Sequence, residues 1–134
     1  MAPWLQPVVK SIVLCDDVMP GPPGTENVHL MNVFSAIRPT RVPPFPYRLT
    51  QACVFLQLTD AEGRIEVQII VKHLESDQIV FASSEHLIDF EHRLQAKWVL
   101  FRLRDCPLPD PGLYCIEFHC NGQWVTDLTF SALD

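Results

Sequence analysis

The stretch that decides the fold is Asp110–Phe130, which reads DPGLYCIEFHCNGQWVTDLTF. Apolar and polar residues alternate from Tyr114 to Cys120, and the alternation resumes after the pair Asn121-Gly122. A period of two is typical of a strand that buries one face, and Asn-Gly favours a tight hairpin turn. The stretch therefore predicts the closing hairpin of an antiparallel sheet.

The register of this hairpin follows from burial. A two-residue turn would pair Ile116 with Asp127 and so place a carboxylate opposite the apolar face. A slip of one residue moves every side chain to the other face, so burial favours a three-residue loop over 121–123 with a bulge. The longer loop pairs Tyr114 with Phe130, Ile116 with Leu128 and Cys120 with Trp124.

The same period extends the β pattern through the chain. The other predicted strands are 8–18, 28–37, 49–60, 64–72, 77–84 and 97–105. Segment 85–95 fits a short helix or an irregular loop, and the loop is favoured. Short strands with frequent turn residues predict an all-β, antiparallel sandwich of seven to eight strands, formed by one domain over residues 1–134.

The spacing of Asp110, Gly112 and Tyr114 resembles the tyrosine corner of immunoglobulin-like sandwiches. In that motif a buried tyrosine returns its hydroxyl to the backbone upstream, just before the penultimate strand. The immunoglobulin disulfide would need a cysteine two residues after the tyrosine, and Ile116 stands there. The fold that this spacing predicts is therefore immunoglobulin-like without the disulfide.

Composition limits the partners and the compartment. The net charge of −6 disfavours binding to a phosphate backbone. The first residues lack the pattern of a secretory signal, and no apolar run is long enough to span a membrane. An odd number of cysteines without a signal predicts free, buried thiols in the cytoplasm. The cysteines are Cys15, Cys53, Cys106, Cys115 and Cys120.

The outer face of the predicted hairpin could hold a reactive site. Glu117 lies opposite Asp127 there, flanked by Cys115 and His119, which are candidate metal ligands or parts of a thiol enzyme. The simpler interpretation is a solvated face whose like charges are relieved by water or by a cation such as Arg102. Zinc sites usually show repeated short spacings that this chain lacks, so we expect no metal and no cofactor.

The connection over residues 38–48 has the composition of an interaction surface. Residues 27–59 contain no acidic side chain, and arginines and aromatics alternate with four prolines in the connection. The alternative is a rigid crossover whose aromatics are tucked into the edge of the core. The candidate partner-binding residues are Arg38, Arg41, Phe45, Tyr47 and Arg48.

Four motifs resemble a family of small bacterial single-domain proteins known only as a domain of unknown function. They are NVHLMNVFSAI, PPFPYRL, the turn DAEG, and PGLYCIEFHCNG. The resemblance covers most of the chain and implies an immunoglobulin-like β-sandwich. It implies no activity and no catalytic residue.

The predicted function is a non-enzymatic module for protein interaction or assembly, which binds a protein partner or a second copy through residues 38–48. One alternative is a ligand- or carbohydrate-binding domain, which would need two tryptophans in one groove; the candidates are Trp4, Trp98 and Trp124. The other is a metal- or thiol-dependent enzyme. Glycine-rich phosphate loops and nucleophile elbows are absent from the sequence, and the five scattered histidines are expected at the surface.

Overall fold

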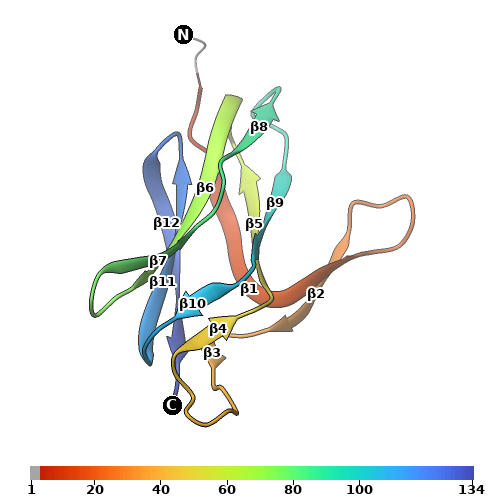
Figure 1. Ribbon diagram of the computed structural model, residues 1–134. Helices are drawn as coiled ribbons and strands as arrows, with labels where there is room; N and C mark the ends of the chain where they lie inside the picture. Colours follow the sequence, from red (N-terminus) through yellow and green to blue (C-terminus); the bar gives the residue numbers. More distant parts are fainter. Residues whose placement is uncertain (1–3) are drawn as a thin grey trace.

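The computed structural model describes residues 4–134, which form twelve β-strands in three sheets (Figure 1). The strands are β1 (Val8–Pro20), β2 (Val28–Val33), β3 (Ala36–Ile37), β4 (Tyr47–Leu49), β5 (Ala52–Thr59), β6 (Gly63–His73), β7 (Gln78–Ala82), β8 (His86–Phe90), β9 (Lys97–Leu103), β10 (Cys106–Leu108), β11 (Gly112–Cys120) and β12 (Gln123–Ala132). The all-β prediction is confirmed. The predicted count of seven to eight is too low, because the short strands β3, β4, β8 and β10 were not recognised.

The first large sheet has the strand order β2-β1-β5-β9, and its neighbouring strands are antiparallel. Alternate residues of β5 enter the core, as the sequence pattern predicts. They are Ala52, Val54, Leu56 and Leu58. The opposite face of β5 carries Cys53 and Phe55, which are also buried but lie outside that core cluster.

The second large sheet has the order β3-β12-β11-β6-β7, and β8 also pairs with β6. β7 pairs with the end of β6 near His73, whereas β8 pairs with its beginning near Gly63, so both line one side of β6. The predicted core face of β6 is confirmed. The two large sheets and the small sheet of β4 and β10 contribute apolar side chains to one core.

The second predicted strand, 28–37, is interrupted and changes sheets. β2 pairs with β1 in the first sheet, whereas Ala36 and Ile37 run parallel to the end of β12 in the second. Asn32 has a φ of 55°, a left-handed conformation that asparagine tolerates better than most residues. The break itself falls at Phe34 and Ser35, and it lets one segment connect the two large sheets.

Segment 85–95 is neither a helix nor the loop that we expected over its whole length. Its first half is β8, in which Ile88 is half-buried and Phe90 is buried. Leu87 points out and is 62% exposed, which obscured the alternation in the sequence. Only the residues after Phe90 form the connection to β9.

The closing hairpin combines the predicted core register with a shorter turn. Tyr114 pairs with Phe130 and Ile116 with Leu128, as expected, but Cys120 pairs with Gln123 rather than with Trp124. The turn therefore has two residues, both with positive φ, and not three. A register shift after Phe118 leaves one extra residue in β12 and restores the apolar pairs beyond it.

The predicted tyrosine-corner geometry is present at the start of β11. Tyr114 is fully buried, and its hydroxyl donates to the Asp110 carbonyl at 2.7 Å. Gly112 has a φ of 132°, and a Cβ at this position would lie 3.1 Å from His73 Nε2. His73 itself is buried, contrary to the expectation for histidines, and its ring nitrogens lie within hydrogen-bonding distance of Ser76 Oγ and the Pro111 carbonyl.

Candidate functional site

The basic loop, residues 38–48, presents its charges to solvent and its aromatic rings to the core. Arg38, Arg41 and Arg48 are exposed. Phe45 and Tyr47 are half-buried and pack against the core cluster. The two interpretations of this segment are therefore compatible, since the aromatics anchor the loop while the arginines remain accessible.

The polar contacts of the basic loop leave its positive charges without a carboxylate. Arg41 Nε donates to the Pro43 carbonyl at 3.1 Å, and Arg48 Nη1 donates to the Asp105 carbonyl at 3.1 Å. Within residues 4–134, no ion pair involves an arginine of this loop. Backbone carbonyls orient two of the guanidinium groups and neutralise none.

On the outer face of the closing hairpin, Glu117 lies opposite Asp127, as the predicted register requires. The cation that relieves the like charges is Lys72 on β6, whose Nζ lies 3.4 Å from Glu117 Oε2. The suggested Arg102 does not serve this role, because it lies on β9 in the other large sheet. His119 Nε2 lies 3.0 Å from Glu117 Oε1, and this hydrogen bond, followed by Lys72, lowers the pKa of Glu117.

This arrangement gives little support to a metal or thiol site at Cys115. Both oxygens of Glu117 are engaged, and the part of the chain that the structure describes contains no cluster of three potential metal ligands. Burial, followed by the charges of Asp127 and Glu117, raises the pKa of Cys115 to about 11. The thiol therefore keeps its proton at neutral pH, whereas a nucleophile needs the thiolate.

All five cysteines are free and buried, which confirms their predicted burial. Cys106 and Cys120 belong to the core, and burial raises the pKa of each to about 12. Cys15 and Cys53 are paired across β1 and β5 on the other face of the first sheet. Burial also raises their pKa values, so these side chains act as small apolar groups.

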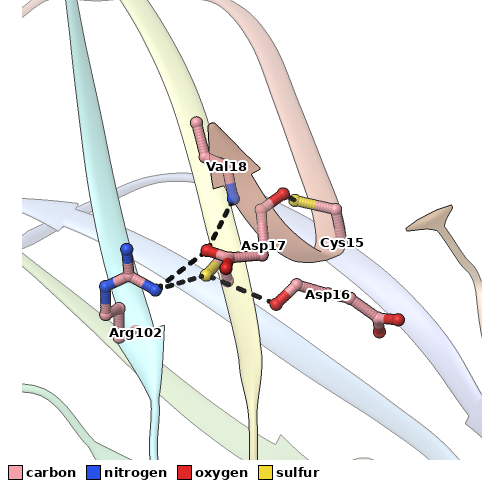
Figure 2. Close-up of polar contacts among 6 residues, drawn as sticks. Cys15, Asp16, Asp17, Val18 and Arg102 are labelled. Carbon is pink, nitrogen blue, oxygen red and sulfur yellow. Dashed lines mark hydrogen bonds and ion pairs between the residues drawn. The ribbon is translucent and has the colours of Figure 1, made fainter. Parts of the chain in front are cut away.

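A polar cluster around Arg102, which sequence reasoning missed, connects β9 to β1 across β5 (Figure 2). Arg102 Nη1 donates to Asp17 Oδ1 at 3.1 Å and lies 3.5 Å from Cys53 Sγ. The Val18 amide donates to the same carboxylate oxygen at 2.8 Å. This bond, followed by that from Arg102, lowers the pKa of Asp17.

The Cys15 and Cys53 thiols complete this cluster by donating to backbone carbonyls of residues 17 and 16, at 3.5 and 3.7 Å. Its members are far apart in the sequence. Predicting this cluster would have required the register of β1, β5 and β9, in which Cys53 pairs with both Cys15 and Arg102. With the thiols protonated and the carboxylate paired, we interpret the cluster as a structural link between strands.

The tryptophans do not share a groove. Trp98 lies 5.8 Å from Phe55, centroid to centroid, and both line a depression of about 420 Å³ together with Ser11, Gln57 and Glu26. Trp4 packs against the core, and Trp124 is exposed near the tip of the closing hairpin. Within the described residues, Trp98 is the one tryptophan that lines this depression, so the criterion for a carbohydrate-binding face is not met.

These observations define an all-β protein whose prominent surface features are an unpaired basic loop and a paired charged face. The chain belongs to DUF6941, a family of unknown function whose model matches residues 10–132. This agrees with the resemblance to a domain of unknown function. No curated protein matches the sequence. The part of the chain that the structure describes contains no helix long and apolar enough to cross a membrane.

One solved structure that resembles the chain is the Pseudomonas fluorescens alkylpurine DNA glycosylase AlkC bound to DNA containing an abasic site analog. The sequence identity is 13% and the TM-score 0.46, over 75% of this chain and 28% of the glycosylase chain. The protein thus spans less than a third of the glycosylase's length. A likeness at this level carries no inference about nucleic acid or catalysis.

Proposed function

We propose that the protein is a non-enzymatic module for protein interaction or assembly, and that the basic loop is its contact surface. The observation that carries the proposal is that the charges of Arg38, Arg41 and Arg48 are exposed and, among the described residues, unpaired. They are exposed in a protein of net charge −6, and no ion pair of the described residues involves them. Their charges are therefore available to an acidic surface on another protein or on a second copy of this chain.

The chemistry of the loop supports a binding role. Guanidinium groups recognise carboxylates through a planar set of donors, and arginine is enriched at protein interfaces. Four prolines restrict the backbone, while Phe45 and Tyr47 fix the loop on the core. Less conformational entropy is lost on binding when the surface is preorganised in this way.

The finer architecture belongs to the same proposal. We infer an immunoglobulin-like arrangement of the two large sheets, supported by the bond from Tyr114 to Asp110 and by the apolar core that the sheets share. Five buried free thiols are compatible with a cytoplasmic protein. The raised thiol pKa values and the paired Glu117 favour a binding module over a thiol enzyme.

The test compares two triple variants that remove the same positive charge. The first is Arg38→Ala, Arg41→Ala and Arg48→Ala. The control changes three exposed cations outside the loop, namely Lys10, Arg64 and Arg93, to alanine. Affinity capture from the native host with mass spectrometry, together with sedimentation of the pure protein, covers both a foreign partner and self-association.

We expect both variants to unfold at nearly the wild-type urea concentration, because exposed charges contribute little to stability. Only the loop variant should lose the captured protein or the self-association, and the wild-type complex should weaken as salt rises. Equal capture by the loop variant and the wild type would contradict the proposal. So would a loop variant that is unstable but binds normally, because the arginines would then be internal supports.

A further inference from the structure

A second surface feature lies where the open sides of the two large sheets meet. We call it the edge slot, a cleft of about 510 Å³. One wall is formed by residues 81–84 and His86, from the end of β7 to the start of β8. The other wall is formed by residues 100–102 of β9 and by Arg104 just after it. The basic loop contributes no residue to its lining.

The free side of β9 forms one wall of the slot. Phe101 points into the core and is 1% exposed, whereas the neighbouring Arg102 points outward. Side chains of consecutive strand residues point in opposite directions, so both residues can line one cleft only where the edge of the strand backbone faces that cleft. β9 is the last strand of its sheet, and its backbone has no partner beyond β5 within the described residues.

The opposite wall is ordered and carries polar groups. Ser83 donates its amide to the Ile69 carbonyl at 3.0 Å, and its Oγ accepts from the Ile69 amide at 3.0 Å. His86 stacks on Phe101 with their centroids 5.2 Å apart, and Ser84 Oγ lies 3.4 Å from its Nε2. The wall thus holds an imidazole in a defined position beside the free strand.

The arginines that line the slot are its charged residues. Its lining includes Arg102 and Arg104 but no aspartate or glutamate. Asp17 already pairs with Arg102, whereas Arg104 has no ion pair within residues 4–134. Every charged side chain from Lys97 to Arg104 is basic. A second β9 would therefore be repelled, while an acidic strand would be attracted.

We propose that the edge slot binds an extended acidic polypeptide segment of a partner protein, which adds to β9 as a further strand. The backbone of β9 supplies the hydrogen bonds, as in other cases of strand addition to an open sheet edge. A carboxylate of that segment pairs with Arg104, which lines the slot opposite His86. This site is separate from the basic loop and does not depend on the function proposed for it.

The probe is a capped peptide of alternating valine and glutamate, with seven residues to match the length of β9. It is titrated into the isotope-labelled full-length protein and followed by the amide resonances. We expect saturable shifts in β9 and in residues 81–86, and slower hydrogen exchange on the free side of β9. The Arg104→Glu variant should bind about tenfold more weakly or worse, the effect of losing one charge-assisted contact.

Three controls test whether binding depends on the slot itself. Arg93→Glu makes the same change at an exposed arginine outside the slot and should bind like the wild type. The triple alanine variant of the basic loop should also bind normally. A peptide N-methylated at alternate residues should not bind, because it lacks the donors of one strand edge.

The inference fails if a peptide of alternating valine and lysine binds as well, or if Arg104→Glu leaves the affinity unchanged. It also fails if the shifts map to another surface. If the protein alone shows the same β9 shifts as its concentration rises, the occupant is a second copy and not an acidic partner.

Discussion

The substitution Tyr114→Phe, which removes one oxygen atom, tests the tyrosine corner at the start of β11. The Tyr114 hydroxyl donates to the Asp110 carbonyl at 2.7 Å and lies 3.4 Å from the Asp110 amide nitrogen. The ring is fully buried and stacks on Phe130 with a centroid distance of 5.4 Å. Tyr114→Phe therefore keeps the packing and removes only the polar link to residue 110.

The expected loss of stability depends on the backbone groups of Asp110 that lose the hydroxyl as a partner. A buried group that loses its hydrogen-bond partner costs about 1–3 kcal/mol. Asp110 is exposed, so water can replace part of the lost interaction with its backbone. We therefore expect the free energy of unfolding to fall by about 1–2 kcal/mol for Tyr114→Phe. Tyr114→Ala also loses the ring packing and should cost about 3–5 kcal/mol.

The assay is urea unfolding followed by tryptophan fluorescence, supported by thermal melts. A loss of this size should lower the melting temperature by about 3–8 °C for a chain of this length. Tyr47→Phe is the matched control, since Tyr47 is the one other tyrosine and its hydroxyl has no hydrogen bond in the described structure. If Tyr114→Phe unfolds at the wild-type midpoint, or if Tyr47→Phe costs as much, the hydroxyl does not stabilise the corner.

Three further outcomes follow from the charges and thiols. Burial raises the pKa of Cys106 and Cys120 from 9.0 to about 12, so above pH 9 the unfolded chain releases protons that the native state retains. Urea stability should therefore decline between pH 9 and pH 12, and less steeply in Cys106→Ala; a flat profile would contradict this. The pKa of Glu117 is lowered from 4.5, chiefly by His119, so its contribution is present above pH 4.5 and is lost as the pH falls through the native value. Glu117→Gln should weaken that acid dependence and cost about 1 kcal/mol or less at neutral pH, and an unchanged acid profile would argue against the pairing. Added zinc should leave the melting temperature unchanged, because Lys72 and His119 already occupy both carboxylate oxygens; a rise that scales with zinc concentration would restore the metal hypothesis.

The elements that the sequence predicts best are those in which burial imposes a period of two. In β6 burial alternates from Ile65 to His73, and the inward residues Ile65, Val67, Ile69 and Val71 are fully buried, with Ile70 the one apolar residue on the outer face. The strands β3, β4 and β10 could not be recognised in this way, because two or three residues contain too little of the period. The change of sheet after β2 depends on which strand each half of the segment meets, and the apolar pattern of residues 28–37 contains no such information.

The candidate surfaces were predictable only in part. The arginines of the basic loop and the face around Glu117 lie within single segments, so composition and alternation could identify them. The cluster around Arg102 and the edge slot depend on which strands are neighbours. Arg102 pairs with Asp17 across 85 positions of sequence, and no local pattern contains that information. Lys72 was missed as the partner of Glu117 for the same reason.

The closing hairpin shows how two correct local preferences can give a wrong prediction when they are assumed to exclude one another. Asn121-Gly122 favours a two-residue turn, and both residues have positive φ, as the type I′ hairpin turn requires. Burial favours the register in which Tyr114 faces Phe130. Placing Val125 in a bulge satisfies both, because one extra residue in β12 shifts the pairing between the turn and the core. The predicted loop over 121–123 placed the extra residue in the turn, where it would have sacrificed the favoured Asn-Gly geometry; the bulge places it in a strand that is half exposed at that point.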